Sequence, residues 1–436
     1  MRTLPLLRLA RWCAGHPGPV LGAWLLFLVV AASEGLAATS GGSAQAGLVS
    51  APSAGSVLAV GCLLTALLLL LVLGSLRLAA LAFGYLATVG VSALGVLMAI
   101  SEAGAGAFGS WNLVLLPGIT SAANHLLFAV RRQQEMPPGK HDASDTAQIV
   151  ASTAGRTALV TGLAMLAAMT GLYLTGEPQV MRLAAAVVLV VLVEAAAALS
   201  LLPVLLTRIA LPVRRSFQWH WLPRFVARLP ATWRYRSAAG LIGALVCAAA
   251  ALGFVVYRYL ESPTLPPLPL ALLIGLTSLA VITAFRPVAV ALTTAVLSVL
   301  SALFALTMLT CMAPPTPTWL PVALVAVLAA PTTDMHVCLL HHFRVEALTG
   351  MSPQHVLAEG LRRGTVAISS ASVVSIGVFS ALGIAGTGAL SEFGWAAAAA
   401  LAMDVLVIRL VLLPLLLSLA GPVRWWRRTG PGAARK

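Results

Sequence analysis

The sequence predicts an all-α integral membrane protein of about twelve transmembrane helices, arranged as two parallel six-helix repeats. Three observations support this fold class. Of the 436 residues, 60% are hydrophobic and 9% are charged, whereas about a quarter of the residues of a soluble chain carry charge. The hydrophobic runs are about 18–25 residues long, which suits helices that cross a bilayer. The basic residues fall in alternate loops between these runs.

The first hydrophobic run resembles a secretory signal, because Arg2, Arg8 and Arg11 precede it and small residues follow it. The run over 19–36 is long enough to span a membrane, so we expect an uncleaved first helix. The remaining spans are read between charges and Pro/Gly positions. The expected spans are 18–36, 54–74, 78–101, 111–130, 156–175 and 183–206, then 238–258, 268–285, 287–311, 319–341, 365–386 and 394–419.

The distribution of charge predicts the orientation of the chain. Alternate short loops are basic, as is the tail from Arg424 to Lys436. The loops between them carry glutamate, with Arg182 and Arg258 as basic exceptions. Basic short loops stay in the cytoplasm, and an even number of spans returns the chain to its starting side. We therefore expect a multi-pass protein of the inner (plasma) membrane with both termini in the cytoplasm.

A basic, aromatic segment over 207–237 divides the chain into halves. Arginine interleaved with tryptophan also occurs in nucleic-acid-binding patches. Because hydrophobic spans flank this segment, we interpret it as a linker on anionic lipid and predict no nucleic-acid partner. The predicted domains are a first six-helix repeat (1–206), the linker (207–237), a second six-helix repeat (238–420) and a basic cytoplasmic tail (421–436).

The two halves echo each other after their fourth spans. "LLFAVRRQQE", a polar loop and a span ending "LSLLPVLL" in the first half correspond to "CLLHHFRVE", a polar loop and a span ending "LVLLPLLLSL" in the second. Units with an even number of spans give parallel repeats, and a substrate or ion path is expected at their interface.

Two stretches carry a resemblance to a known family. One is the opening "LARWCAGHPGPVLGAWLLFLVVAASEGLAATSGGS"; the other runs from Pro331 to Trp426 and contains "TTDMHVCLLHHFRVE", "AEGLRRG" and "EFGWAAAAALAMDVLVIRLVLLPLLL". They resemble the first helix and the last three helices of the MMPL branch of the resistance-nodulation-division (RND) transporters. Members of that family use the proton-motive force to export lipids or other hydrophobic molecules. The resemblance implies the same function here, with membrane lipid and a hydrophobic small molecule as ligands.

The resemblance also implies a reduced form of the family. Its members carry a large extracytoplasmic domain after the first span of each half, whereas the loops over 37–53 and 259–267 are too short for a domain. A second copy of the chain or a partner transporter subunit is therefore a candidate partner.

The resemblance further implies the location of a proton relay. The family's relay is an Asp-Tyr pair on the fourth and tenth spans. By its flanking residues, Asp334 corresponds to the aspartate of the tenth span, whereas Met335 replaces its tyrosine. On the fourth span Asn124 stands where the aspartate would be and His125 where the tyrosine would be. An ionisable group in hydrocarbon costs at least ~2.5 kcal/mol, so it normally faces the bundle interior and has a partner. We predict that His125 faces Asp334 across the two halves as a substitute proton-sensitive pair; the alternative is a purely structural hydrogen bond.

Three more charged residues lie deep in the expected spans: Glu194 in the sixth, and Asp404 and Arg409 in the twelfth. A spacing of five places Asp404 and Arg409 on partly different helix faces, so a direct pair requires the long side chains to bend toward each other. We expect contacts with other helices as their main role. Together with Met335, these residues are predicted to provide intramembrane polar support.

The sequence was also searched for a metal site and for the motifs of enzymes. Asp334, Cys338 and His341 or His342 recur at helical spacing and could ligate a metal ion. A second ligand cluster is lacking, so interfacial polar residues are the favoured interpretation, and no metal or cofactor is predicted. The sequence holds no nucleophile elbow, phosphate loop or hydrolase-type pair of carboxylates, so no enzyme is predicted.

Two functions remain open at this point. The preferred one is an MMPL-like exporter of a hydrophobic substrate. The alternative is a non-transporting, degenerate paralogue that acts as a membrane scaffold or accessory subunit.

Overall fold

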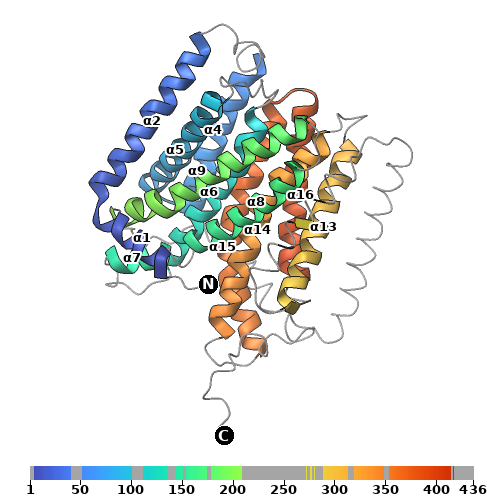
Figure 1. Ribbon diagram of the computed structural model, residues 1–436. Helices are drawn as coiled ribbons and strands as arrows, with labels where there is room; N and C mark the ends of the chain where they lie inside the picture. Colours follow the sequence, from blue (N-terminus) through green and yellow to red (C-terminus); the bar gives the residue numbers. More distant parts are fainter. Residues whose placement is uncertain are drawn as a thin grey trace.

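The computed structural model is helical throughout the regular structure of its described residues, with no strand among them (Figure 1). It describes residues 4–40, 52–100, 111–134, 143–150, 154–173, 178–208, 288–312, 319–347, 353–413 and the single positions 272, 275, 276, 279 and 416. The predicted all-helical fold is confirmed for these residues. The expected spans 238–258 and 268–285, the linker beyond residue 208 and the tail over 421–436 lie outside them, apart from those single positions.

The first half contains eight described helices. Seven of them are long or moderately long, and α7 is short. Their bounds are α1 (Leu4–Gly15), α2 (Pro17–Ser40), α4 (Pro52–Leu73), α5 (Leu76–Ile100), α6 (Trp111–Gln134), α7 (Ala143–Val150), α8 (Arg156–Tyr173) and α9 (Pro178–Arg208).

The described part of the second half contains four α-helices, the last of which continues into a π-helix. Their bounds are α13 (Val288–Met312), α14 (Trp319–Ala347), α15 (Pro353–Ala385), α16 (Ala389–Met403) and η4 (Asp404–Leu412). The last expected span is therefore α16 and η4 together. Gly388 has a φ of 55° in the turn before α16, a conformation that glycine adopts without steric cost.

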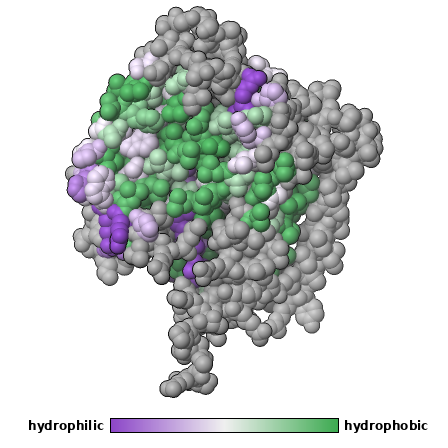
Figure 2. All heavy atoms as spheres, in the orientation of Figure 1, coloured by the Kyte–Doolittle hydropathy of each residue, from purple (hydrophilic) through white to green (hydrophobic). Residues whose placement is uncertain are grey.

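Six of the described helices are long and apolar enough to cross a membrane. They lie within α5, α6, α9, α14, α15 and in α16 with η4. The bent pair α1 and α2 adds a seventh candidate; α4, α8 and α13 hold shorter apolar helices at other expected spans. On the face shown in Figure 2, hydrophobic residues cover the middle of the molecule and hydrophilic residues gather towards two ends. This is the surface expected of a protein embedded in lipid.

Two helices form the centre of the fold. The apolar window of α14 is 100% buried and that of α6 is 89% buried, compared with 50% in α5 and α9. In Figure 1, α2 lies at one edge of the described bundle and α13 at the opposite edge. Polar side chains on α6 and α14 are therefore shielded from lipid by other helices, where a charged group in a membrane protein is best tolerated.

The helices approach one another closely where their side chains are small. Gly383 of α15 and Gly394 of α16 lie so near each other that a Cβ atom on Gly394 would come within 2.3 Å of the Gly383 nitrogen. Small residues at such crossings allow close backbone packing in membranes. The crossing fixes the position of α16, and thereby of η4, which follows it.

Candidate functional site

Asp334 of α14 is the centre of a buried hydrogen-bond network. Its carboxylate accepts hydrogen bonds from Ser121 Oγ and Thr161 Oγ1, both at 2.6 Å, and a longer one from Asn124 Nδ2 at 3.4 Å. His125 Nε2 lies 3.1 Å from Asp334 Oδ1. Asp334, Asn124 and His125 are 0% exposed. The network joins α6 and α8 of the first half to α14 of the second, so the structure brings Asp334, His125 and Asn124 together.

Glu194 of α9 extends the network on the far side of His125. Its Oε1 atom lies 2.5 Å from His125 Nδ1, so the imidazole sits between two carboxyl groups. Glu194 is 1% exposed. The sequence interpretation gave Glu194 only a supporting role, because nothing in the order of the chain relates α9 to His125.

The chemistry of the Asp334–His125–Glu194 triad sets the smallest number of protons that it holds. An ionised carboxylate can only accept hydrogen bonds, so each of the two contacts that His125 makes with a carboxyl group requires a proton. With two protons, the triad is either an imidazolium between two carboxylates or a neutral imidazole with one protonated carboxyl. Both forms carry one net negative charge. A proton can therefore change its position along the triad without changing the net charge of the buried site.

Helix α15 closes the site from the second half. Ser375 Oγ donates to Asn124 Oδ1 at 3.3 Å, and Ser372 Oγ lies 3.5 Å from the sulfur of Met335. Met335 therefore packs beside the site and makes a contact with α15, while Asp334 next to it makes the polar contacts with the first half.

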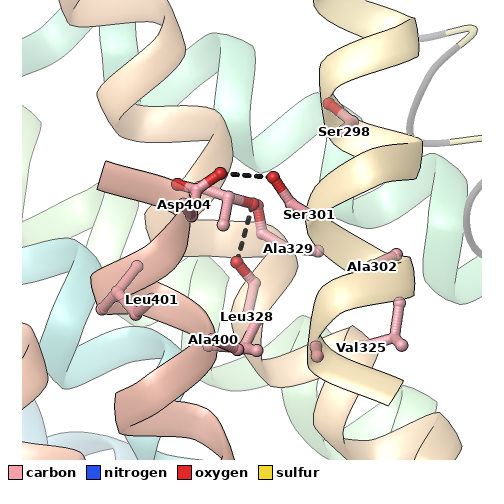
Figure 3. A pocket seen from close by; sticks show the side chains of 11 residues that line it. Ser298, Ser301, Ala302, Val325, Leu328, Ala329, Ala400, Leu401 and Asp404 are labelled. Atoms are coloured by element: carbon pink, nitrogen blue, oxygen red, sulfur yellow. Dashed lines mark hydrogen bonds between the residues drawn. The ribbon is translucent and has the colours of Figure 1, made fainter. Parts of the chain in front are cut away.

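Asp404 and Arg409 form a second polar centre. Arg409 Nε donates to Asp404 Oδ2. Ser301 Oγ of α13 donates to Asp404 Oδ1, as Figure 3 shows. Arg409 Nη2 donates to the Thr332 carbonyl of α14 at 2.7 Å. Asp404 and Arg409 are 1% and 0% exposed. The expectation of contacts with other helices agrees with the bonds to α13 and α14.

Asp404 and Arg409 also pair directly, the arrangement that the sequence left open for long side chains that bend toward each other. The π-helical geometry of η4, which spans Asp404–Leu412, favours this pair. A π-helix bonds residue i to residue i+5, so residues five apart point in more similar directions than they do in an α-helix. The sequence interpretation assumed 3.6 residues per turn.

The two centres lie on opposite sides of α14. Thr332 and His336 are four residues apart and share one face of the helix, whereas Asp334 lies midway between them in sequence and faces the other way. His336 Nδ1 lies 3.0 Å from the Thr332 carbonyl, the oxygen that also accepts from Arg409. One helix thus carries groups of both centres.

Several residues of the two centres carried no recognisable signal in the sequence. They are small hydroxyl residues or lie beside a residue that attracted attention for another reason, and small residues are abundant in these spans. The missed residues are Ser121, Thr161, Ser301, Thr332, His336 and Ser375. Among the described residues no group of three His, Cys, Asp or Glu side chains could hold a metal ion.

Comparisons with known proteins agree with the resemblance seen in the sequence. Residues 270–436 match the model of the MMPL family. The chain is 32% identical over 107 residues to the "Heme uptake protein MmpL11" of Mycobacterium tuberculosis, which covers 24% of this chain and 11% of the relative. It is 31% identical over 107 residues to the "Mycolic acid-containing lipids exporter MmpL11" of Mycolicibacterium smegmatis, with the same coverage. These matches thus span about a ninth of the relatives' length.

A solved structure shares the fold. SecDF, a translocon-associated membrane protein from Thermus thermophilus, superposes with a TM-score of 0.68 at 14% identity, covering 84% of this chain and 62% of that chain. At this identity the likeness concerns the fold alone.

The fold and the buried polar centres define a class: a polytopic helical membrane protein with ionisable groups in the interior of its bundle. The comparisons add a likeness to a family: residues 270–436 match the MMPL family model, and the chain is similar over 107 residues to the MmpL11 proteins.

Proposed function

We propose that the protein is a membrane transporter that uses the proton-motive force to export a lipid or another hydrophobic small molecule. The observation that carries this proposal is the Asp334–His125–Glu194 triad, which is fully buried and joins α6 and α9 of the first half to α14 of the second. Isolated ionisable groups in hydrocarbon are costly, so a connected set at the centre of a bundle is a functional site by default.

In the proposed mechanism, protonation of the triad changes how the two halves hold each other. Ionised Asp334 accepts hydrogen bonds from Ser121 and Thr161, and each is stronger because the acceptor is charged. A proton added to Asp334 removes that charge and weakens the attachment of α14 to α6 and α8. Alternation between a tightly and a loosely held α14 would couple proton entry to rearrangement at the interface of the halves.

We extend the proposal to the whole chain. It would contain twelve spans in two parallel repeats, 1–206 and 238–420, with both termini and the 421–436 tail in the cytoplasm. Only residues 41–51 join α2 to α4, which supports a form that lacks an extracytoplasmic domain at this position. The names of the two MmpL11 relatives refer to lipid export and haem uptake, and both cargoes are largely hydrophobic.

The proposal is tested in liposomes that contain the purified full chain and carry an imposed pH gradient. We expect movement of a fluorescent phospholipid to the outer leaflet together with dissipation of the gradient, reported by an internal pH dye. Asp334→Asn should abolish both signals, because an amide cannot carry the proton. Asp145→Asn, the same change on α7 away from the triad, is the matched control and should leave both signals intact. Transport and pH response that survive Asp334→Asn would contradict the proposed role of Asp334.

A second candidate function is that of an accessory subunit or scaffold for a complete transporter, whether a second copy of the chain or a different protein. The short connection over 41–51 favours it, because a partner could supply the missing extracytoplasmic part. This candidate predicts no flux from the chain alone and recovery of flux when a complete MMPL transporter is present in the same liposomes.

A further inference from the structure

The Asp404–Arg409 centre borders a cavity. The cavity lies between α13, α14 and the junction of α16 with η4 and has a volume of about 30 Å³, while one water molecule needs about 10–15 Å³. Its polar lining comes from Ser298, Ser301, Thr332 and Asp404, and alanine, valine and leucine line the rest. Figure 3 shows Ser298, Ser301 and Ala302 on one helix, opposite Asp404 and Leu401. The cavity is therefore large enough for about two waters and has polar groups to bind them.

Two side chains that are bonded to Thr332 in the lining of this cavity each have a buried nitrogen without a hydrogen-bond partner within the described part of the chain. The two nitrogens are Arg409 Nη1 and His336 Nε2, on side chains whose residues are 0% and 1% exposed. Both side chains are held at the Thr332 carbonyl, Arg409 through Nη2 and His336 through Nδ1. Thr332 and Asp404 line the cavity and both bind Arg409, so the guanidinium is bonded to two residues of the cavity lining.

The two nitrogens have complementary chemistry. Guanidinium nitrogens can only donate. His336 Nδ1 faces a carbonyl oxygen, which can only accept, so this nitrogen carries the proton and neutral Nε2 is left as an acceptor. A buried donor or acceptor without a partner costs about 1–3 kcal/mol. Water satisfies both at once, since it accepts from Arg409 and donates to His336.

We infer that the Asp404–Arg409 centre is a built water site: water enters through the α13–α14–α16 cavity, and its innermost molecule bridges Arg409 Nη1 and His336 Nε2. The bound water gives Arg409 a further hydrogen-bond acceptor, because the guanidinium otherwise has only Asp404 and one backbone oxygen as partners among the described residues. This site is separate from the Asp334 triad, since it lies on the other face of α14. The inference does not depend on the proposed transport.

Hydroxyl-radical footprinting by millisecond X-ray irradiation tests the site in the intact protein in lipid nanodiscs, because radiolysis of bound water oxidises the side chains next to it. His125 is the matched internal control: it is the same residue type, is equally buried, and contacts Glu194 and Asp334 through its two nitrogens. We expect mass spectrometry to show His336 oxidised several-fold faster than His125.

A cavity-filling variant sharpens the test. Ala302→Leu places a larger side chain in the cavity and should slow the oxidation of His336, while the rate at His125 stays unchanged and thereby reports an intact fold. If Ala302→Leu does not yield folded protein, the wild-type comparison of the two histidines decides alone. Oxidation of His336 no faster than His125, or a rate at His336 that Ala302→Leu leaves unchanged in a folded protein, overturns the inference.

Discussion

The Asp334 triad and the Asp404–Arg409 centre are both fully buried, yet they differ in how well their groups are satisfied. Asp334 has contacts with four side chains from two helices of the opposite half. Asp404 has contacts with two side chains within the described residues, and its partner Arg409 keeps one nitrogen unbonded there. The difference indicates that the densely bonded Asp334 can hold two halves together, whereas Asp404 depends on one ion pair with Arg409 and one hydrogen bond from Ser301.

The largest effect on stability is expected from His125→Leu. The change leaves Asp334 and Glu194 as two buried carboxyl groups without the imidazole between them, and loss of one partner from a buried charged set costs about 3–5 kcal/mol. Thermal unfolding in detergent, followed by tryptophan fluorescence, measures it. The exposed residue His355 supplies the control, because His355→Leu should cost far less than His125→Leu. Equal unfolding temperatures for His125→Leu and the wild type would contradict a stabilising role of His125 between the two carboxyl groups.

The next largest effect on stability is expected at the Asp404–Arg409 centre. Arg409→Met should destabilise the protein by about 3 kcal/mol, because Asp404 is left buried without its cation. The double variant Asp404→Leu with Arg409→Met should recover most of that loss, since an apolar pair of similar volume can replace a buried ion pair. The same unfolding assay measures both. A double variant less stable than Arg409→Met alone would mean that the pair stabilises the fold through bonds that apolar side chains cannot replace.

A smaller loss of stability is expected when one hydrogen bond is removed from each centre. Removal of a bond to a charged group typically costs about 1.5–3 kcal/mol, and Ser301→Ala should fall in this range because Asp404 keeps only Arg409 among its described partners. Thr161→Val should cost less, because Asp334 retains Ser121 and His125. The reverse order of the two unfolding free energies would contradict the difference drawn between the centres.

The smallest effect is expected at Tyr85 of α5, which is 1% exposed and whose hydroxyl has no hydrogen-bond partner within the described residues. Tyr85→Phe removes that hydroxyl and should change the free energy of unfolding by less than about 1 kcal/mol, with stabilisation as the favoured direction. A loss of more than about 2 kcal/mol would show that the hydroxyl is bonded in the folded protein.

The hydrophobic pattern predicted most of the described fold. Runs of apolar residues long enough to cross a bilayer have few other solutions, so the expected spans agree with α2, α4 to α6, α8, α9 and α13 to η4 within a few residues at most ends, although α15 begins well before its expected span. Two short helices were missed. Helix α7 lies where a polar loop was expected, and α1 was missed because three arginines near the start of the chain were interpreted as a flank of the first span. In the structure Ala10 and Cys13 on one side of α1 are buried and Trp12 is 53% exposed, an arrangement typical of a surface helix.

The candidate site was less predictable for a physical reason. The prediction that His125 faces Asp334 came from the match of two spans, and both residues do lie in contact. The role of Glu194 depends on how α9 packs against α6, which periodicity within one helix does not report. The direct Asp404–Arg409 pair depends on a π-helix, and the sequence gives no periodic signal for a single widened turn.

Helix α14 bears Asp334 on one side and Thr332 with His336 on the other, and it is enclosed along its whole apolar length. A helix that is bonded on two faces cannot rotate relative to one set of neighbours without also rotating relative to the other. Rotation by one residue, about 100°, would break both the contacts of Asp334 with α6 and the hydrogen bond from Arg409 to the Thr332 carbonyl. A change that loosens the contacts on one face of α14 therefore also alters how the polar groups on its other face are aligned with their partners.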